Sequence, residues 1–285
     1  MSQGLTVGIV GAGSVGQALA RLLAAEFDVL VTSRSHARAA AAVAGIEARV
    51  ATLDPLASSS DCVVVAVRDR AVSEVAAALA RFDPGAALQA SGALGPASLA
   101  PLRKRGVPCA MFHPLQTFPT PDAGVQRLRG SRVGVCGDDR ALAWCERLAA
   151  ALRCTTLKVA EDQLARYHAA AVLASNCVVG LVDAAATLME GAGVERADAL
   201  RALRPLLDAS LENASTMEAN QALTGPIARG DAVTVRRHFG SMRNSPTALV
   251  GLYRAFGEYL LDLAQRRGLP ASEAAAVRSA LREEC

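Results

Sequence analysis

The sequence changes its pattern near residue 160, and this change constrains the fold more than any other feature. Up to that point, short apolar runs rich in β-branched residues alternate with helical patterns. The apolar runs lie at residues 5–11, 28–34, 46–52, 62–67, 86–91, 108–113, 132–137 and 155–160, and the clearest helical patterns lie at 14–27, 70–81, 97–105 and 139–152. Such alternation is typical of a doubly wound α/β sheet whose strands are mainly parallel. From residue 161 onward only helical periodicity is present, so we expect a sheet domain over residues 1–160 and an all-helical domain over residues 161–285.

Composition and charge narrow the class of protein. The 285 residues are 52% hydrophobic and 20% charged, which indicates a soluble globular chain. The net charge of +3 is too small to indicate nucleic acid or a membrane surface as a partner. The seven cysteines form no CxxC pair, so we expect reduced thiols in a cytoplasmic protein and no metal site. The N-terminus has no basic region or cleavage site of a signal peptide.

One stretch, residues 169–189, is apolar and long enough to span a membrane. Asn176 and Asp183 interrupt it, and no aromatic residues flank it. We therefore interpret it as a helix that is buried between packed neighbours or between subunits. A homodimer formed through the helical domain is the corresponding prediction.

A glycine-rich turn directly follows the first predicted strand and opens a helix. It has the spacing Gly-x-Gly-x-x-Gly, in the strand–turn–helix context that dinucleotide binding by a Rossmann domain requires. The first glycine permits the tight turn, the second admits the pyrophosphate, and the third lets the helix pack close to the sheet. The residues expected to bind the cofactor here are Gly11, Ala12, Gly13, Ser14, Val15 and Gly16. The alternative is a turn that serves packing only.

The end of the second predicted strand indicates which dinucleotide is bound. Domains specific for NAD usually place an acid there, which binds the ribose hydroxyls. This sequence has Ser33, Arg34 and Ser35 instead. A guanidinium can pair with a 2′-phosphate through two parallel hydrogen bonds, and the serines can add single ones. We therefore predict NADP(H) as the cofactor; the alternative is a solvated surface arginine.

Two further turns are expected to run beside the cofactor, because each follows a predicted parallel strand. Val67 and Arg68 lie at the end of the fourth strand. Ser91 and Gly92 end the fifth strand and can approach the nicotinamide end of the cofactor.

Six motifs, spread over nearly the whole chain, resemble one family of bacterial proteins: Rossmann-like NADP oxidoreductases with a helical C-terminal domain of unknown function. The motifs are GIVGAGSVGQALA, VAVRDRAVSEVA, ASGALG, FHPLQTF, YHAAAVLASN and ALTGPIARGD, in this order. The family is similar in architecture to pyrroline-5-carboxylate reductases, ketopantoate reductases and the 6-phosphogluconate dehydrogenase group. The resemblance implies a helical domain that often dimerises, and an active site in the cleft between the domains.

The sequence departs from these relatives at the position of the proton donor. Hydroxyacid dehydrogenases and ketopantoate reductases are expected to carry Lys-x-x-x-Asn on the first long helix of the second domain. Asn176 matches the asparagine, but Val172 stands where the lysine belongs, and no lysine follows Lys158. A lysine acid from the helical domain of the same chain is therefore excluded.

His168 is the leading replacement, because an imidazole titrates near physiological pH and suits general acid–base work. Helix geometry places Ser175 and Asn176 near the same face as His168, where they can bind a substrate carbonyl or carboxylate. Tyr167 points about 100° away from His168 and is not expected to join them. The alternative role for His168 is that of a hydrogen-bonded polar residue where the helix meets the sheet.

His113 is the rival candidate, since it ends a predicted strand at the edge of the sheet where ligands bind. Gln116 and Thr117 follow it and are expected to bind substrate; the alternative is a turn that these side chains hold in place. Thr224 and Arg229, in a predicted loop between helices, are candidates to bind a substrate carboxylate or phosphate. The alternative for Arg229 is a surface pair with Asp231. His36 and His238 are assigned no role.

These observations lead to two hypotheses of function. The first is an NADPH-dependent reductase of the C=O or C=N bond of a small keto or imino acid. A ketopantoate-like 2-oxo acid comes first and a pyrroline-5-carboxylate-like imine second, with a deazaflavin left open as hydride partner. The second hypothesis is a non-catalytic NADP(H)-binding sensor or assembly protein.

Overall fold

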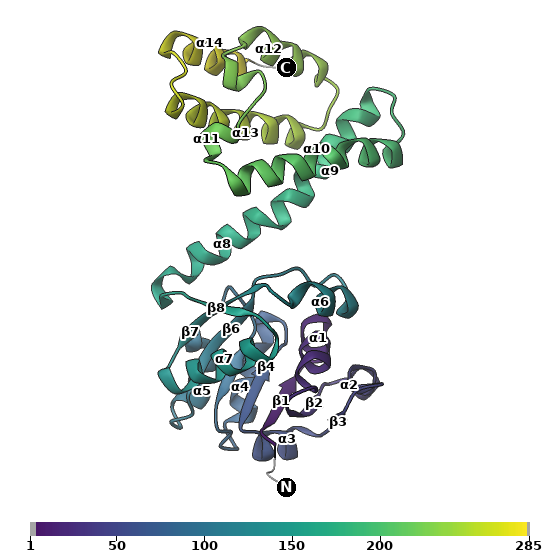
Figure 1. Ribbon diagram of the computed structural model, residues 1–285, viewed down its shortest axis with the longest axis vertical. Coiled ribbons are helices and arrows are strands. Elements are labelled where there is room, and N and C mark those ends of the chain that lie inside the picture. Colours follow the sequence, from purple (N-terminus) through teal and green to yellow (C-terminus); the bar gives the residue numbers. More distant parts are fainter. Residues whose placement is uncertain (1–3, 284–285) are drawn as a thin grey trace. The chain divides into compact units, whose positions relative to one another are not determined.

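The computed structural model describes residues 4–283 and divides into two compact units, Met1–Ser175 and Asn176–Cys285 (Figure 1). The first unit contains a sheet with helices on both faces, and the second is helical, which confirms the predicted fold class. The predicted boundary after residue 160 falls at the end of the sheet. The helix that follows, α8 (Leu164–Ala174), belongs to the first unit.

The sheet contains all eight predicted strands, in the spatial order β3-β2-β1-β4-β5-β6-β7-β8. Strands β1 to β6 are parallel to their neighbours, β7 is antiparallel to β6, and β8 is parallel to β7. The strands are β1 (Thr6–Val10), β2 (Asp28–Thr32), β3 (Ala48–Val50), β4 (Cys62–Val65), β5 (Ala87–Gln89), β6 (Cys109–Pro114), β7 (Arg132–Gly137) and β8 (Thr155–Lys158). The carboxyl ends of β1, β4, β5 and β6 therefore lie along one edge of the sheet.

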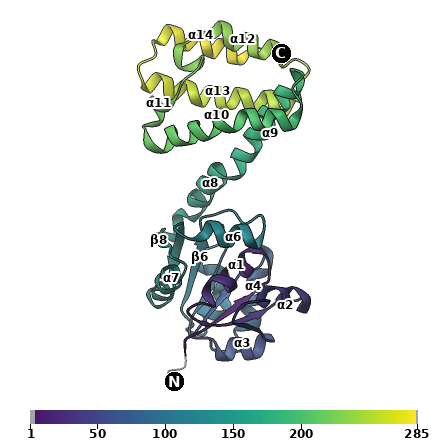
Figure 2. The ribbon, with the colours of Figure 1, turned by 45° about the vertical axis from the view of Figure 1, so that its right-hand side comes forward.

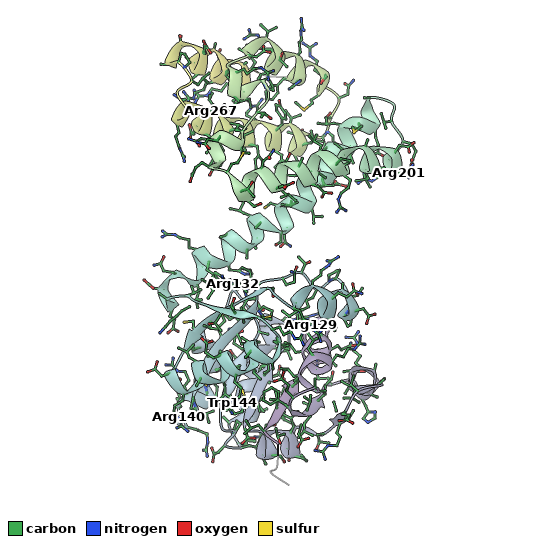
Figure 3. The ribbon with its side chains drawn as sticks, in the orientation of Figure 1. Arg129, Arg132, Arg140, Trp144, Arg201 and Arg267 are labelled. Carbon is green, nitrogen blue, oxygen red and sulfur yellow. The ribbon has the colours of Figure 1, made fainter. Side chains whose placement is uncertain are left out.

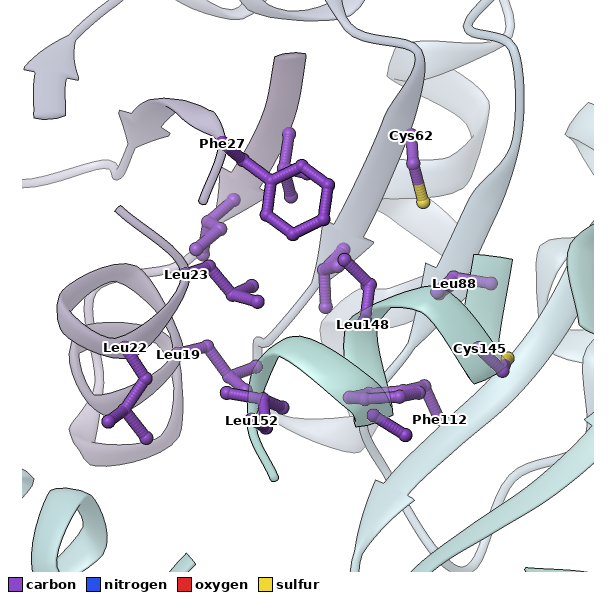
Figure 4. Close-up of a cluster of buried hydrophobic side chains, with 14 of the residues drawn as sticks. Leu19, Leu22, Leu23, Phe27, Cys62, Leu88, Phe112, Cys145, Leu148 and Leu152 are labelled. Atoms are coloured by element: carbon purple, nitrogen blue, oxygen red, sulfur yellow. The ribbon is translucent and has the colours of Figure 1, made fainter. Parts of the chain in front are cut away.

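Alternating side chains along the strands create two apolar faces, each covered by helices. Val7 and Ile9 of β1 pack on one face, whereas Val10 packs on the other. The first face is covered by α1 (Ser14–Leu23), α2 (His36–Val43), α6 (Pro121–Leu128) and α7 (Asp139–Ala151). The second is covered by α3 (Leu53–Ser59), α4 (Asp69–Leu79), the 3₁₀ turn η1 (Pro96–Leu99) and α5 (Ala100–Arg103). Figure 4 shows the first core, where Leu19 of α1 and Leu148 of α7 meet Phe112 of β6.

The helical unit has its own core. Its elements are α9 (Asn176–Gly191), α10 (Arg196–Thr216), α11 (Ala219–Ala222), the 3₁₀ turn η3 (Ile227–Arg229), α12 (Ala232–Ser241), α13 (Thr247–Arg266) and α14 (Ala271–Arg282). Helices α12, α13 and α14 pack together (Figure 2) around Val235, Leu261 and Val277, which are fully buried. Gly257 of α13 allows a close approach, because a Cβ there would lie 2.4 Å from Leu281 of α14.

The apolar helical segment Glu161–Gly191 remains largely uncovered in the single chain. Its most apolar window has a mean hydropathy of 1.7, and only 6% of that window is buried within the described chain. Leu173 and Val179 are 63% and 71% exposed. Neighbours within the described chain therefore cover little of this helix. Burial by a second subunit stays a prediction.

The same segment is interrupted at Ser175, where φ is −127° and ψ is −74°. The Ser175 hydroxyl donates to the carbonyl of Ala171 at 2.6 Å, a local bond that competes with helix geometry. The predicted single helix is thus two helices, α8 and α9, that meet at this residue.

Candidate functional site

The glycine-rich turn forms a tight cradle at the carboxyl end of β1. Gly11 has φ +118°, and a Cβ there would lie 2.3 Å from the carbonyl oxygen of Ala66, so only glycine fits. Gly16 is equally restricted, because its Cβ would lie 1.9 Å from the carbonyl oxygen of Gly11. A Cβ at Gly13 would meet no atom of the described chain within 4 Å. The protein's own packing therefore does not require glycine at Gly13, whereas a pyrophosphate approaching the backbone would.

The start of α1 is suited to an anion. Gly13 is the N-cap residue and supplies no side-chain hydrogen bond, so the first N–H groups of the helix face outward without a capping side chain. Ala12 is buried, and its carbonyl accepts a hydrogen bond from the Gln17 amide at 3.0 Å. Ser14 and Val15 form the first turn of the helix. These residues fit the phosphates of a dinucleotide.

The turn after β2 fits a 2′-phosphate. Arg34 is exposed there. Ser33 accepts a hydrogen bond from the Ser35 N–H at 3.4 Å, and Ser35 caps α2 by accepting from the Arg38 N–H at 3.3 Å. Both hydroxyls thus hold the turn that presents Arg34, and each still has its own proton to donate.

The turns after β4 and β5 continue the same edge of the sheet. Val67 lies beside the cradle, since its side chain would be 3.0 Å from a Cβ on Gly11, and Arg68 is exposed at the N-terminus of α4. Ser91 and Gly92 are held by a residue that the sequence analysis missed, the fully buried Gln89. Gln89 accepts from the Ser91 N–H at 2.7 Å and donates to the Ser91 carbonyl at 3.1 Å.

A cluster of two histidines and a tyrosine lies at the end of β6. The Nδ1 atom of His113 is 2.8 Å from the hydroxyl of Tyr167 on α8. Two glycines make room for this contact. Gly134 lies opposite His113 on β7, and a Cβ there would lie 2.2 Å from the Tyr167 hydroxyl. A Cβ on Gly92 would lie 2.6 Å from the His113 ring.

The first turn of α8 is anchored to the sheet, which fixes the position of Tyr167. Leu164 is 5% exposed and packs with Met111 of β6 and Cys136 of β7. Tyr167 packs against the same three side chains. The helix therefore starts from a fixed position, although no later residue of it is fully buried.

His168 completes the cluster. Its ring lies 6.1 Å from the ring of His113, measured between centroids. Its Nδ1 atom is buried and has no hydrogen-bond partner among the described residues. A buried polar atom without a partner is rare and costs free energy, so it marks a position where a ligand group can bind.

Burial sets the protonation of His113 and Tyr167. Burial, followed by the nearby His168, lowers the pKa of His113 to about 4, and Asp69 opposes this shift. Burial raises the pKa of Tyr167 to about 12. Near neutral pH the imidazole of His113 is thus uncharged and the phenol of Tyr167 keeps its proton. This pair has one N–H and one O–H but shares only one hydrogen bond, so in either tautomer one donor remains for a ligand.

The cluster and the glycine cradle lie along one edge of the sheet. Strand β6 is three strands away from β1, through β4 and β5. Neighbouring strands are spaced by about 4.8 Å, so the two sites are separated by roughly 14 Å in this direction. That span would suit an extended dinucleotide, with the cradle holding its phosphates and the ends of β5 and β6 receiving its nicotinamide.

Gln116 and Thr117, predicted to bind substrate, have partners in their own loop. Gln116 donates to the carbonyl of Arg127 at 3.3 Å, and the Arg127 guanidinium donates to the Thr117 hydroxyl at 3.2 Å. These contacts favour the alternative of a turn that its own side chains hold in place. A substrate role for Gln116 and Thr117 remains a prediction.

Ser175 and Asn176 lie at the junction of the two units. Ser175 ends α8 and belongs to the first unit, whereas Asn176 opens α9 in the second. Because the helix is interrupted between them, the helical geometry that grouped His168 with Asn176 does not apply beyond Ala174. Their substrate-binding roles remain predictions.

Thr224 and Arg229 lie in the helical unit. Both line a pocket of about 440 Å³, together with Arg267 at the end of α13 (Figure 3). Asp231 caps α12, since it accepts from the Thr234 N–H at 3.0 Å. A role for Thr224 and Arg229 in substrate binding remains a prediction.

Several solved structures resemble this chain. A candidate NADP oxidoreductase of Bacteroides fragilis has a TM-score of 0.74 at 20% identity, over 91% of this chain and 99% of that one. The imine reductase of Myxococcus stipitatus in complex with NADP⁺ has a TM-score of 0.66 at 16% identity, over 98% and 100%. The pyrroline carboxylate reductase of Plasmodium falciparum with NADP bound has a TM-score of 0.62 at 13% identity, over 98% of each chain. At these identities the likeness shows the fold. No curated protein sequence matches the chain significantly.

Two family models match separate segments. Residues 6–88 match the family described as "NADP oxidoreductase coenzyme F420-dependent". Residues 131–260 match the "Domain of unknown function (DUF2520)". The first match confirms the predicted class, an NADP-dependent oxidoreductase, and the predicted cofactor, NADP(H). The chain thus contains one segment similar to the NADP oxidoreductase family and, after it, one segment similar to the DUF2520 family.

Proposed function

We propose that the protein is an NADPH-dependent reductase of the C=N or C=O bond of a small imino or keto acid. The observation that carries this proposal is the His113–Tyr167 hydrogen bond beside the unpaired ring nitrogen of His168. NADPH bound at the glycine cradle supplies the hydride. The residues of the chain must then hold the substrate and manage the proton.

Tyr167 is suited to hold that proton. Its phenol stays protonated near neutral pH, because burial raises its pKa to about 12. Where the Nδ1–H of His113 donates to the tyrosine oxygen, the Tyr167 O–H is the spare donor and can bind the substrate oxygen or nitrogen. A phenolate left after proton transfer would be stabilised by the same hydrogen bond from His113.

The buried Nδ1 of His168 supplies a second contact. A substrate group that pairs with this nitrogen removes the free-energy cost of leaving it unpaired. His168 and Tyr167 are adjacent on α8, and both face the ring of His113. Together they offer two directional hydrogen bonds to one small substrate.

An imine is better matched to this cluster than a ketone. With its pKa at about 4, His113 is an uncharged imidazole near neutral pH and not an acid, so a C=O substrate would rely on Tyr167 alone for its proton. The nitrogen of a C=N substrate is more basic than a carbonyl oxygen and takes the proton of the Tyr167 O–H more readily, and an uncharged His113 does not repel the positive charge that develops on it. The names of two structural relatives, an imine reductase and a pyrroline carboxylate reductase, support the same order. We therefore place a small cyclic imino acid ahead of a 2-oxo acid.

We also propose that the protein acts as a cytoplasmic homodimer. The segment Glu161–Gly191 leaves an apolar surface that a second copy of the chain would bury. The exposed side chains of Leu173 and Val179 are the clearest parts of that surface.

The experiment that tests the reaction follows NADPH oxidation with a panel of cyclic imines and 2-oxo acids. An oxidised deazaflavin is included as a hydride acceptor, because the description of the matched family names coenzyme F420. Turnover of an imino acid that falls with Tyr167→Phe supports the proposal. Tight NADPH binding without turnover of any panel member would favour the non-catalytic sensor instead.

A further inference from the structure

A second histidine–tyrosine pair lies in the helical unit, at a position to which the sequence analysis assigned no role. The Nδ1 atom of His238 on α12 is 2.6 Å from the hydroxyl of Tyr253 on α13. Their rings meet edge to face, with centroids 5.8 Å apart. Both residues are half-buried.

The pair borders a pocket of about 420 Å³ between α9, η3 and α13. Apart from Thr224 and this pair, the residues that line it are apolar or glycine, among them Leu181, Leu188, Leu252 and Phe256. None of the described residues that line the pocket is charged. Its volume lies within the range of about 300–1,000 Å³ that is usual for small-molecule sites.

The protons of the pair determine what the pocket can recognise. A neutral histidine and a tyrosine have one N–H and one O–H, and one of these two protons is used in the bond between them. In either tautomer, one donor remains at the edge of an apolar pocket. Burial also raises the pKa of Tyr253, so its phenol keeps its proton near neutral pH.

We propose that this pocket binds a small uncharged compound with an apolar body and one hydrogen-bond acceptor, such as a carbonyl oxygen. The apolar body fills the space between α9 and α13, and the acceptor pairs with the spare donor of His238 and Tyr253. A charged ligand would lose its hydration without gaining a counter-charge in this pocket.

The competing occupant is an apolar segment of a second copy of this chain. Apolar side chains would cover the pocket but would leave the spare donor of the pair buried without a partner, which costs free energy. A carbonyl compound satisfies the apolar wall and the donor together. The pocket belongs to the helical unit alone, so this inference does not depend on the proposed reductase activity.

The test uses three probes on the full chain without NADPH, with affinities measured by ligand-observed NMR titration. Acetophenone carries the apolar body and the acceptor, ethylbenzene lacks the acceptor, and benzoate carries a charge. We expect acetophenone to bind at least about fivefold more tightly than ethylbenzene, the usual worth of one hydrogen bond, and benzoate to bind more weakly than either. Equal affinities for acetophenone and ethylbenzene would overturn the proposal.

Variants locate the site. Ala185→Phe adds a ring at a position that lines the pocket and should abolish acetophenone binding. Ala255→Phe is the matched control, because Ala255 is exposed on α13 and does not line the pocket. The double variant His238→Phe/Tyr253→Phe should bind both probes equally, and retained ethylbenzene binding would show that it is folded.

Two results contradict the proposal. Unchanged acetophenone binding in Ala185→Phe would place the probe elsewhere. If Ala185→Phe dissociates a dimer in sedimentation while the wild type binds no probe, the pocket is covered by a second copy of the chain.

Discussion

Tyr167 and His113 are 54 residues apart in the sequence, yet the tyrosine hydroxyl lies 2.8 Å from Nδ1 of the histidine. The contact requires a glycine on the neighbouring strand, because a Cβ at Gly134 would lie 2.2 Å from that hydroxyl. It also requires Leu164, which anchors the first turn of α8 on the sheet. Three separate elements thus combine to hold one hydrogen bond.

Tyr167→Phe removes the O–H that we assign to the substrate. We expect turnover to fall by about 10²-fold or more, which is the usual range for general acid–base help, with NADPH affinity unchanged. Tyr259→Phe is the matched control, because Tyr259 is 59% exposed on α13. Steady-state kinetics on the imine identified by the panel measures the effect. Full activity of Tyr167→Phe would remove Tyr167 from the mechanism.

Single substitutions distinguish the roles of the two histidines of the cluster. His168→Ala should lower turnover by about 10²-fold or more and leave NADPH affinity nearly unchanged, since it removes the ring nitrogen that we assign to the substrate. His113→Ala should have a smaller effect, because this imidazole acts through Tyr167. Single-turnover measurements with saturating NADPH compare them. If His113→Ala abolishes turnover while His168→Ala is nearly neutral, the roles are reversed.

The lowered pKa of His113 predicts a pH dependence of stability. An unfolded histidine takes up a proton below about pH 6.5, whereas folded His113 does so only near its lowered pKa of about 4. In this window the unfolded state binds more protons, so the free energy of unfolding decreases as the pH falls from about 6.5 to about 4. His113→Gln should lose stability less steeply over the same window. Thermal melts at several pH values measure both slopes, and parallel curves would contradict the assigned pKa.

Arg34→Ala tests the basis of cofactor choice. We expect the wild type to bind NADP(H) at least about tenfold more tightly than NAD(H), about 1.4 kcal/mol, and the variant to lose most of that preference. The physical reason is the loss of a guanidinium that can pair with the 2′-phosphate. Arg140→Ala is the control, since Arg140 is an exposed arginine at the start of α7 (Figure 3). Calorimetric titration with both cofactors would refute the role of Arg34 if the variant kept the full preference.

A charge on the apolar helix tests the dimer. Val179→Glu places a carboxylate on a residue that is 71% exposed in the single chain, and we expect it to convert a dimer to monomer at micromolar concentration. Val233→Glu is the control, because Val233 is 54% exposed on α12, outside the apolar segment. Sedimentation equilibrium reads out the mass. A wild type that is monomeric under these conditions would exclude the proposed dimer.

The local sequence pattern was sufficient to predict the strands of the sheet and the glycine-rich turn that forms the cradle. The central strands could be predicted because β-branched runs such as 62–67 are buried on both faces and read as continuous apolar segments. Helices α2, α3 and α6 were not predicted. They are short, and their alanine run, prolines and glycine leave little apolar periodicity to indicate a helix. For α6 the signal was present: Thr120 caps the helix and Pro121 is its first residue.

By itself, the sequence determined the order of the elements, the glycine turn, the basic residue at the end of β2, and the absence of a lysine after Lys158. Only the tertiary structure decided that Tyr167 joins His113, that Gln89 holds the turn after β5, and that the apolar helix is interrupted and uncovered. The physical reason is that periodicity reports the direction of a side chain around its own helix. It does not report which distant strand that helix packs on, and here α8 packs so that both Tyr167 and His168 meet the ring of His113.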